Sequence, residues 1–561
     1  MTVTVAWQRS LRRAPEGARR WLYCGEDAAW RLDAARGRLA SLEEVRTGAA
    51  RGRLAADLRQ PYLDWLAELG VAHDSFEWWS SPLAAKNVYT HLFSRIVALA
   101  ATLEALEDGL LVVCSTPALV AEVGEAARER GLTVARRPGR NLRRPAYMAA
   151  WRAGQTLARE HAPRVEPGDA TSLLATWVDE RNLGAAGVYS DPYFGPLPDM
   201  LAEHGERVAF LARPLAGTSL REFAPRLLET GGRFLFPGAW LTAGDRAAAR
   251  RAAFRFSPMI PASARVGPAP VARLARELIA QERINHVEAL GYRSLVRNLV
   301  SAGARFERVV IPWEGHAWET ALTAAVHEHL PGCSVIGYEN VNFSSLALSL
   351  YPGKAEVGVR PLPDRVVTNG PTFARILAGQ GFPENRIRVG CALRHGYVHE
   401  IEPRAAAEGF VLAAGSIDAA QTIELVETAF AAFGDDLVVK LHPAVDAARV
   451  KSAVRARVAY SERPIGELLR EARAMLYTYS VVPYEALAAG VPPIFVQSET
   501  FLDLDQLEPT PDMRLVARTP EDLREADRRA AQFGPEWRAR AREVVSQALA
   551  PRDDGCVEAF L

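Results

Sequence analysis

The chain has 561 residues, of which 49% are hydrophobic and 24% charged, and its 67 basic side chains balance its 67 acidic ones. This is the composition of an ordinary globular protein, and at about 150 residues per domain the length predicts about three to four domains. The neutral balance argues against a nucleic acid or another polyelectrolyte held by bulk charge.

Targeting signals and cysteine patterns are few in this sequence. No stretch approaches the roughly 18 uninterrupted apolar residues of a spanning helix, so we expect no transmembrane segment. The first residues lack the apolar core of a signal peptide, which predicts a cytoplasmic protein and leaves association with the inner face of the membrane open. The cysteines at 24, 114, 333, 391 and 556 are widely spaced without a CxxC pair. We expect neither a disulfide framework nor a structural zinc site.

Residues 1–165 are predicted to form an α/β region that binds the acceptor or a partner. The apolar run 109–114 is typical of a buried strand, and the pattern over 118–130 is that of an amphipathic helix closed by a glycine. A second strand is expected at 132–135, which completes a βαβ-like unit.

Aromatic and polar residues alternate in the segment 77–87 of this region. Trp79 and Lys86 are expected to bind a saccharide, because an aromatic ring can stack on a sugar whose hydroxyls bond to polar side chains nearby. The alternative is that the paired tryptophans anchor the core.

Residues 166–400 repeat the alternation of strand and helix. Mainly apolar strands are expected at 187–190, 208–211, 309–312, 334–338 and 365–368. Each ends in polar or small residues, which is typical of a parallel sheet covered by helices, with ligands at the carboxyl ends of its strands.

A linker rich in Pro, Ala and Glu is expected at 401–409, and residues 410–561 form a second alternating unit followed by charged helices. The predicted fold class is therefore α/β. It comprises two Rossmann-like, doubly wound domains facing a cleft, with an additional N-terminal α/β region.

The strand 437–440 ends in the sequence Lys-x-His-Pro. Lys440 and His442 fall where a doubly wound sheet presents ligands, and together they can neutralise the phosphate of a nucleotide leaving group. Lys440 is one of only four lysines among the 67 basic residues, so it is expected where a compact ammonium is needed. The alternative for His442 is a cap on a backbone carbonyl.

Further nucleotide contacts are expected between the next strand and the helix that follows it. The hydroxyls of Thr478 and Ser480 and the exposed amides at the start of that helix form a natural phosphate cradle. Glu485 lies one turn further, where its carboxylate can accept both hydroxyls of a ribose. The alternative is a glutamate that only favours the positive start of the helix.

Candidate catalytic groups lie in the middle region. Glu314 and His316 directly follow a strand, and an acid and an imidazole there suit general acid–base or nucleophilic work at an anomeric carbon. Asp191, before a tight turn, is the second candidate for the catalytic carboxylate. The alternatives are a capping Glu314, a packed His316 and a turn-forming Asp191.

Three more residues of the middle region are expected to bind the sugar or the acceptor. Glu339 and Asn340 end a strand, and Arg394 follows the last strand before the linker. The alternative is that these are ordinary polar loop residues in water.

The stretch 480–496 resembles the nucleotide-binding helix of GT-B glycosyltransferases, in which a glutamate at the position of Glu485 binds the ribose. The Lys-x-His-Pro sequence is similar to that of bacterial sialyltransferases, Kdo transferases and CDP-glycerol polymer transferases. The resemblance implies that His442 binds the nucleotide phosphate beside the hydroxyl of Ser480. It also implies that a loop at Gly415 and Ser416 lies against the nucleotide.

This resemblance implies a metal-independent glycosyltransferase of bacterial surface polysaccharide biosynthesis that needs no cofactor. The implied donor is a nucleotide-sugar, best a CMP-linked ulosonic acid such as Kdo or a sialic-acid-like sugar, and the acceptor is a saccharide or lipid-linked saccharide. Alternatives on the same fold are a UDP- or CDP-linked donor, a UDP-sugar 2-epimerase and a glycerophosphate polymerase. A non-catalytic glycan-binding assembly subunit is the alternative from another class.

Overall fold

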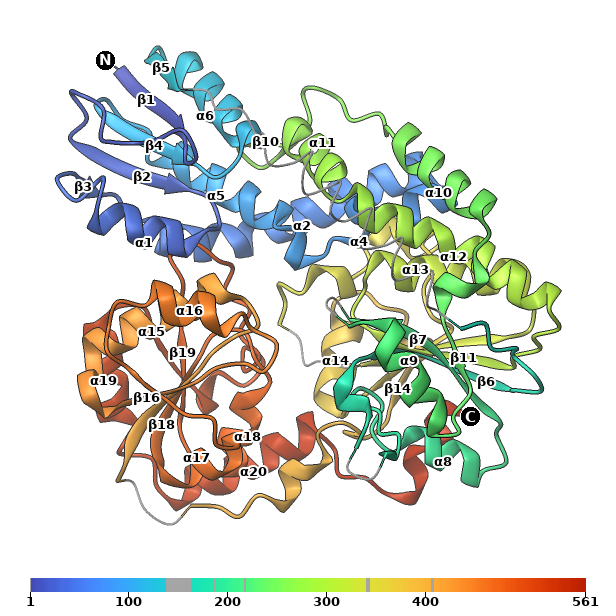
Figure 1. Ribbon diagram of the computed structural model, residues 1–561. Helices are drawn as coiled ribbons and strands as arrows, with labels where there is room; N and C mark the ends of the chain where they lie inside the picture. The colour runs from blue at the N-terminus through green and yellow to red at the C-terminus, as the bar shows by residue number, and fades with distance from the viewer. Residues whose placement is uncertain (1, 138–162, 185–186, 216–217, 340–343, 405–407) are drawn as a thin grey trace.

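The computed structural model describes residues 2–137, 163–184, 187–215, 218–339, 344–404 and 408–561 (Figure 1). Three parallel sheets follow one another along the chain and define an N-terminal, a middle and a C-terminal unit. In Figure 1 the N-terminal unit lies above the C-terminal unit, and the middle unit lies beside them. In the part of the chain that the structure describes, no helix combines the length and apolarity that crossing a membrane requires.

The N-terminal sheet has five strands in the order β3-β2-β4-β1-β5. Its strands are β1 (Thr2–Trp7), β2 (Arg20–Cys24), β3 (Glu43–Glu44), β4 (Leu110–Cys114) and β5 (Thr133–Arg137). Its helices are α1 (Ala28–Arg36), α2 (Gly48–Ala72), α3 (Phe76–Trp79), α4 (Pro82–Ala85), α5 (Leu92–Glu104) and α6 (Pro117–Glu129). All five residues of β4 are buried and apolar, as a parallel strand covered on both faces requires.

The middle sheet has seven strands in the order β14-β13-β12-β11-β6-β7-β8. The strands are β6 (Ser172–Val178), β7 (Val208–Pro214), β8 (Phe234–Leu235), β11 (Arg308–Trp313), β12 (Ser334–Glu339), β13 (Arg365–Thr368) and β14 (Ile387–Val389). The helices are α8 (Leu197–Glu203), α9 (Leu220–Glu229), α10 (Ala243–Arg255), α11 (Ala272–Gln281), α12 (Arg283–Ser301), α13 (Ala317–His329) and α14 (Pro371–Gly379). A hairpin of β9 (Arg265–Val266) and β10 (Ala269–Pro270) precedes α11.

The strand expected at 187–190 is wrong. Tyr189 makes only an isolated bridge to Leu183, and Val188 is 65% exposed, so this segment is a surface turn rather than a buried strand. The strand that belongs to the sheet is β6, which is buried along almost its whole length.

The C-terminal sheet has six strands in the order β17-β16-β15-β18-β19-β20. The strands are β15 (Phe410–Ala414), β16 (Leu437–Lys440), β17 (Ala459–Tyr460), β18 (Ala472–Tyr477), β19 (Pro493–Val496) and β20 (Leu515–Ala517). The helices are α15 (Ala419–Phe433), α16 (Ala447–Ala453), α17 (Ile465–Glu471), α18 (Val482–Ala488), α19 (Pro520–Ala530) and α20 (Pro535–Ala548).

The strand orders place a switch point in each of the two larger sheets. The middle sheet grows from β6 through β7 and β8 on one side and from β11 onward on the other, so it reverses between β6 and β11. The C-terminal sheet reverses in the same way between β15 and β18. In open parallel sheets, ligands bind outside the carboxyl ends of the strands at such a point. The predicted class of two Rossmann-like domains with an N-terminal α/β region is thereby confirmed.

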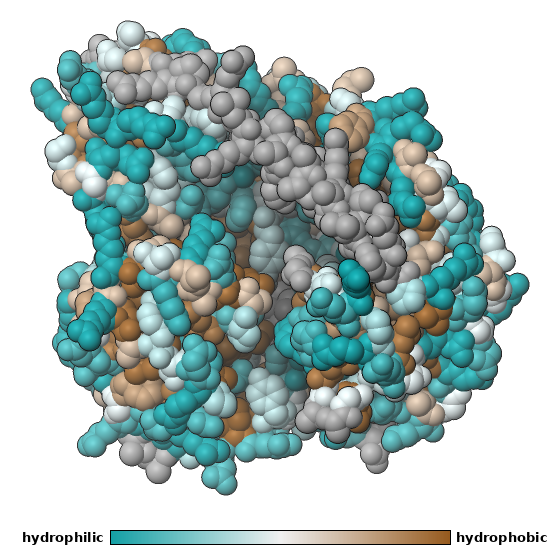
Figure 2. All heavy atoms as spheres, viewed as in Figure 1, coloured by the Kyte–Doolittle hydropathy of each residue, from teal (hydrophilic) through white to brown (hydrophobic). Residues whose placement is uncertain are grey.

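The three units share one apolar core. A single cluster of buried side chains includes Val112 of β4, Ile311 of β11 and Leu412 of β15, one from each sheet. Figure 2 shows the face on which a hollow separates the C-terminal from the middle unit.

The end of the chain returns to the middle sheet. The N–H of Ala550 donates to the carbonyl of Asn369 (2.8 Å), and a disulfide joins Cys391 to Cys556. Phe560 is buried in the core of the middle sheet, next to Tyr338. The expected limits at 165 and 401–409 fall between consecutive sheets, but the last residues of the expected unit 410–561 pack on the middle unit. The disulfide was not expected from the sequence, because cysteines separated by 165 positions give no local signal.

Candidate functional site

The carboxyl edges of the middle and C-terminal sheets meet at the segment that joins α4 to α5. The ring of Tyr89 in this segment lies 6.3 Å from the ring of Tyr479, which follows β18. Burial and the charge of Glu314, which follows β11, raise the pKa of Tyr479 to about 12. Glu314 and Tyr479 mark the two switch points, so the two ligand-binding edges face one another.

Glu314 and His316 form a pair at the end of β11. Nε2 of His316 lies 3.1 Å from Oε2 of Glu314, and both side chains are about one-fifth exposed, at 23% and 21%. Burial disfavours the charged imidazole, but the hydrogen bond to Glu314 and the charge of Glu319 outweigh it and raise the pKa of His316. A carboxylate that stabilises an imidazolium in this way makes the histidine a stronger base.

Asn87 of the N-terminal unit fixes the proton on this imidazole. Its Oδ1 accepts the N–H of Tyr89 at 2.8 Å, so its amide nitrogen is the atom that faces Nδ1 of His316, at 2.5 Å. Because an amide NH₂ can only donate, Nδ1 is the acceptor and Nε2 carries the proton donated to Glu314. No local pattern marks Asn87 as a partner of His316, because the two residues are 229 positions apart along the chain.

Glu319, in the first turn of α13, holds the backbone of this pair. Its Oε2 accepts the N–H groups of Glu314, Gly315 and His316 at 2.9, 2.7 and 3.1 Å. Burial raises the pKa of Glu319 to about 7. Gly315 has φ of +76°, and a Cβ there would lie 2.4 Å from the carbonyl oxygen of Ser349. Only glycine fits this tight turn between strand and helix.

Two arginines of the middle unit act electrostatically on His442 of the C-terminal unit. Its Nδ1 accepts the N–H of Ala444 at 3.1 Å, so Nε2 carries the proton of the neutral ring. Burial and the nearby charges of Arg394 and Arg181 lower the pKa of His442. His442 is therefore a neutral donor at pH 7, and Arg394 and Arg181 are the charged groups that act on it. No local pattern marks Arg181, which lies after β6 in the middle unit, as a neighbour of His442.

The hydroxyl residues expected at the nucleotide differ in the hydrogen bonds that they already make within the protein. Ser416 is buried, and its hydroxyl bonds to Gln421 at 2.9 Å and accepts the N–H of Asp418. Ser480 accepts the N–H of Val482 at 3.2 Å. Thr478 is buried, and its Oγ1 has no partner among the described residues. Thr478 is thus a hydroxyl at this edge that makes no hydrogen bond within the described part of the chain.

Gly415 leaves no room for a side chain at the end of β15. A Cβ at this position would lie 2.9 Å from the methyl group of Thr422. Its N–H donates to the carbonyl of Lys440 at 2.9 Å, which ties the end of β15 to the end of β16.

Glu485 lies against a tyrosine from the segment after the middle sheet. The hydroxyl of Tyr397, in the 3₁₀ turn η8 (Gly396–Glu400), donates to Oε1 of Glu485 at 2.9 Å. Glu485 is only 5% exposed, and burial raises its pKa to about 7. Tyr397 thus occupies Oε1, one of the two carboxylate oxygens that a ribose was expected to meet.

The structure does not place Asp191 as a catalytic group. Asp191 is 3% exposed and its oxygens accept the N–H groups of Tyr193 and Phe194 and the hydroxyl of Tyr189. Burial raises the pKa of Asp191. These bonds close a turn, so the turn-forming alternative fits this residue.

Glu339 and Arg394 occupy different surroundings at the edge of the middle sheet. Glu339 is fully buried, and its Oε2 accepts the N–H of Asn369 at 2.8 Å, so it does not face a sugar as expected. Arg394 is half-buried, and its guanidinium lies 5.3 Å from the ring centre of Tyr193. Asn340 lies outside the described residues.

Trp79 and Lys86 are interior residues, which contradicts the expected contact with a saccharide. Trp79 is 2% exposed, and its indole N–H donates to Oδ1 of Asp74 at 2.7 Å. Lys86 forms an ion pair with Glu356 in which both side chains are fully buried. Burial lowers the pKa of Lys86 to about 8. The paired tryptophans anchor the core, as the alternative proposed.

A pocket of about 340 Å³ lies beside His316. Its walls come from the N-terminal unit, from the ends of β6 and β7, and from α12 and α13, and include Asn87, Tyr89, Trp177, Arg213, Glu288, His316 and Trp318. The pocket opens at the switch point of the middle sheet, so a ligand in it could reach the imidazole. In the described ranges no three His, Cys, Asp or Glu side chains gather as metal ligands, and the expected independence of metal stays a prediction.

No protein-family model and no curated protein matches the sequence. Among solved structures, the chain is similar to the calicheamicin glycosyltransferase CalG4, with 16% identity over 68% of this chain and 94% of that chain and a TM-score of 0.39. It is similar to the glycosyltransferase SnogD from Streptomyces nogalater, with 18% identity over 69% and 98% and a TM-score of 0.36. It is also similar to the UDP-GlcNAc 2-epimerase of Methanocaldococcus jannaschii, with 12% identity over 67% and 99% and a TM-score of 0.38.

Proposed function

We propose that the protein is a glycosyltransferase that moves a sugar from a nucleotide donor on the C-terminal unit to an acceptor on the middle unit. The observation that carries this proposal is the Glu314–His316 pair, which faces the end of β18 across the hollow between the two switch points. A base at the edge of the middle sheet, a histidine donor at the edge of the C-terminal sheet, and the cations Lys440, Arg181 and Arg394 from both units are what a displacement at an anomeric carbon needs.

The donor phosphate is proposed to lie at the carboxyl end of β16. The Nε2–H of neutral His442 donates a hydrogen bond to it, and Lys440, Arg181 and Arg394 supply the positive charge. This charge stabilises the phosphate as the bond from the anomeric carbon to its oxygen breaks. Thr478 offers a further hydroxyl to the nucleotide.

The acceptor hydroxyl is proposed to bind in the pocket beside His316, in place of the amide of Asn87. Nδ1 of His316 takes its proton while the acceptor oxygen forms the new bond to the anomeric carbon. Nε2–H stays bonded to Glu314, whose carboxylate stabilises the imidazolium. In this arrangement His316 is the base, and Glu314 orients it rather than attacking the sugar.

The donor is proposed to be a CMP-linked ulosonic acid, and the acceptor a saccharide or lipid-linked saccharide of a bacterial surface polysaccharide. The support for this finer assignment is the resemblance of residues 440–443 to the Lys-x-His-Pro enzymes. A UDP- or CDP-linked donor would use the same cations.

A thermal-shift titration with CMP, CDP, UDP and GDP tests the donor site. Ligand at about 100 times its Kd stabilises the folded state by roughly 2.7 kcal/mol, so one nucleotide should raise Tm measurably. His442→Ala should abolish the rise, whereas His204→Ala, at an exposed histidine directly after α8, should keep it. If no nucleotide raises Tm, or if the rise survives in His442→Ala, the proposed donor site is wrong.

Product analysis then separates transfer from epimerisation. With the nucleotide-sugar identified by the titration, a transferase releases nucleotide faster when an acceptor saccharide is added. A 2-epimerase would instead convert the donor sugar without any acceptor.

A further inference from the structure

A second cavity, which we call the apolar pocket, adjoins the pocket beside His316. It has a volume of about 350 Å³ and lies between the end of β7, the 3₁₀ turn η4 (Pro237–Trp240), α10 and α12. The two pockets share Trp177, Arg213 and Glu288 as a common wall. A ligand that fills both would pass along these three side chains.

The two pockets differ in character. The apolar pocket is walled mainly by hydrophobic side chains, among them Leu220, Phe236, Leu241, Val287 and Leu295. Its charged residues are Arg213, Arg246, Arg250 and Glu288, which leaves an excess of positive charge. The charged residues of the pocket beside His316 are Arg213, Glu282 and Glu288, which leaves an excess of negative charge. The pair therefore fits a ligand with a hydroxyl-bearing end and an apolar, anionic end.

Arg213 lies in the wall between the two pockets and has a hydrogen-bond donor without a partner in the described part of the chain. Its guanidinium lies 3.6 Å from the ring centre of Trp318 and 3.9 Å from that of Trp177, and its side chain is 5% exposed. Nη2 bonds to Oε1 of Glu288 at 2.6 Å. Nη1 is buried and has no hydrogen-bond partner in the described part of the chain. Buried donors are almost always paired, so an unpaired guanidinium nitrogen beside two cavities points to a ligand atom that accepts from it.

We propose that the apolar pocket binds the hydrophobic part of an amphiphilic acceptor, whose carboxylate or phosphate accepts a hydrogen bond from Arg213 and lies among Arg246 and Arg250. The acceptor is then a saccharide or alcohol linked to an apolar chain or ring system, not a free hydrophilic sugar. The identification of this ligand as the acceptor rests on the proposed transferase function. Its binding does not, and it can be measured without any nucleotide.

A matched pair of fluorescent probes tests the pocket. 1-Anilinonaphthalene-8-sulfonate carries an anion on an apolar ring system, and N-phenyl-1-naphthylamine is the same skeleton without the sulfonate. The anionic probe should bind the full chain at one site, about tenfold or more tighter than the neutral one, as a charge-assisted hydrogen bond implies. Equal affinity of the two probes would overturn the proposal.

Variants locate the binding. Ala249→Phe fills the apolar pocket and Arg213→Met removes the guanidinium, and each should weaken the anionic probe about tenfold or more. Arg250→Glu on the rim should also weaken it, whereas Arg251→Glu, the next residue on α10 and not part of the lining, should not. If circular dichroism shows that Arg213→Met does not fold, the Ala249→Phe variant and the comparison of Arg250→Glu with Arg251→Glu still test whether the probe binds in the apolar pocket. Unchanged binding in Ala249→Phe places the probe elsewhere and overturns the proposal.

A competition experiment identifies the anion that the pocket prefers. A variant at the distant donor site then tests the pocket independently of the proposed transferase function. Dodecanoate or dodecyl phosphate should displace the probe, and dodecanol should not; the better competitor shows which anion the site prefers. If neither anion displaces the probe, the proposal fails. His442→Ala should keep full probe binding even though it loses the nucleotide. If the wild-type chain binds the probe but no nucleotide raises its Tm, the donor site alone is refuted and the apolar pocket stands.

Discussion

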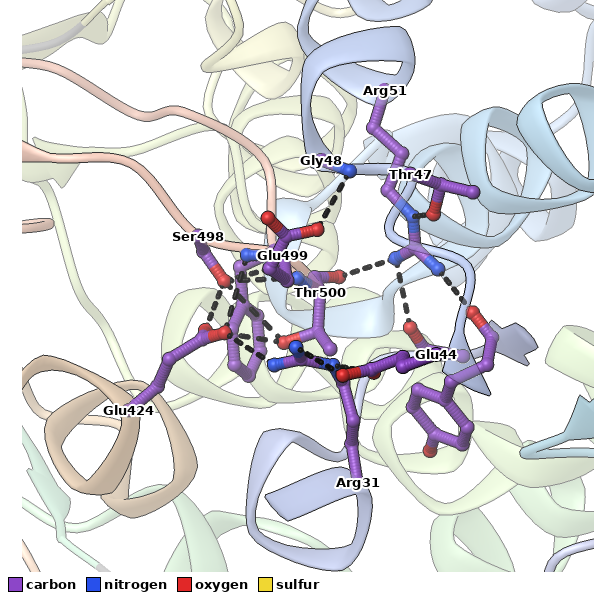
Figure 3. Close-up of polar contacts among 12 residues, drawn as sticks. Arg31, Glu44, Thr47, Gly48, Arg51, Glu424, Ser498, Glu499 and Thr500 are labelled. Carbon is purple, nitrogen blue, oxygen red and sulfur yellow. Dashed lines mark hydrogen bonds and ion pairs between the residues drawn. The ribbon is translucent and has the colours of Figure 1, made fainter. Parts of the chain in front are cut away.

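Arg31 of α1 and Glu424 of α15 form an ion pair, with Nη1 and Oε1 3.1 Å apart, that joins the N-terminal to the C-terminal unit. Both side chains are nearly buried, at 7% and 10% exposure, and Arg31 also pairs with Glu44 of β3 (Figure 3). On the other side, Oε1 of Glu424 accepts the N–H of Glu499 at 3.2 Å. Arg31 is therefore paired with one carboxylate in each unit, and Glu424 is also bonded to the backbone of its own unit.

Arg51 of α2 lies beside this ion pair and crosses the same interface. Its guanidinium donates to the carbonyls of Tyr23 and Gly25 in its own unit and to that of Thr500 in the C-terminal unit (Figure 3). Further along α2, Arg59 donates to the carbonyl of Ser345 in the middle unit at 2.6 Å. One helix of the N-terminal unit thus contacts both sides of the hollow and holds their spacing.

Removing one partner of the ion pair between Arg31 and Glu424 should destabilise the protein strongly. Arg31→Met leaves the nearly buried carboxylate of Glu424 without its counter-charge, at a cost of about 3–5 kcal/mol, whereas Glu424→Gln leaves Arg31 its second partner Glu44 and should cost less. In a double-mutant cycle by chemical denaturation, the double variant should lose less than the sum of the two singles. Arg455→Ala, which breaks the exposed pair with Asp33 across the same interface, should cost only about 0–1 kcal/mol. Additive losses for the buried pair would contradict this coupling.

His316 and Glu314 should affect the chemical step and not nucleotide binding. His316→Ala should lower kcat by about 10²–10⁴-fold, the usual contribution of a general base. Glu314→Gln removes the charge that raises the pKa of His316, so the acid limb of the pH–rate profile should move to lower pH. His327→Ala on the same helix, whose Nε2 bonds to Asp364, serves as the control. If the pH–rate profile of Glu314→Gln equals that of wild type, Glu314 does not tune the pKa of His316 during catalysis.

Glu485 should make stability depend on pH. In the folded protein its carboxyl keeps the proton up to about pH 7, and in the unfolded chain it releases it near its ordinary pKa of about 4.3. Between these values the folded state binds more protons, so the free energy of unfolding falls as pH rises and levels off above the folded pKa.

Glu485→Gln isolates this effect from the other titrating groups. The variant has no carboxyl to titrate at this position. Between pH 4.5 and pH 8 its free energy of unfolding should therefore rise relative to that of wild type, by on the order of 3 kcal/mol. Thermal unfolding of both proteins across this range measures the difference. Parallel pH curves would show that Glu485 does not keep its proton in the folded state.

Lys86 should matter for stability and not for sugar binding. Lys86→Met leaves the fully buried Glu356 with only Arg360, 3.7 Å away, and should cost about 3–5 kcal/mol. Lys354→Met, at an exposed lysine two residues from Glu356, should stay within about 0.5 kcal/mol of wild type. Saccharide or probe affinity should be the same in both folded variants. A selective loss of sugar binding in Lys86→Met at unchanged stability would restore the sequence-based prediction.

The α/β class and the course of several central strands follow from local sequence patterns, whereas β1, β2 and β6 were not predicted. Runs such as 410–414 and 437–440 are apolar because a parallel strand is covered on both faces, and that property is local. The sequence pattern also placed Glu314, His316, Lys440 and His442 at strand ends, because a polar residue directly after a buried run marks the edge of a sheet. Their roles in nucleotide binding and catalysis stay predictions.

Burial of single polar residues lay beyond the sequence. Asp191 and Lys86 have the same local appearance as site residues, yet one closes a turn and the other pairs with Glu356 inside the protein. Whether a polar side chain meets water, a ligand or a buried partner depends on segments far away along the chain.

The tertiary structure alone decided which groups meet. It brings Asn87 to His316, Arg181 to His442 and Tyr397 to Glu485, and it returns the end of the chain to the middle sheet through Cys391 and Cys556. Periodicity and capping report only on contacts within a few residues. The pairs that set the proton on His316 and the charge around His442 join different units, so only the packing of the three sheets could fix them.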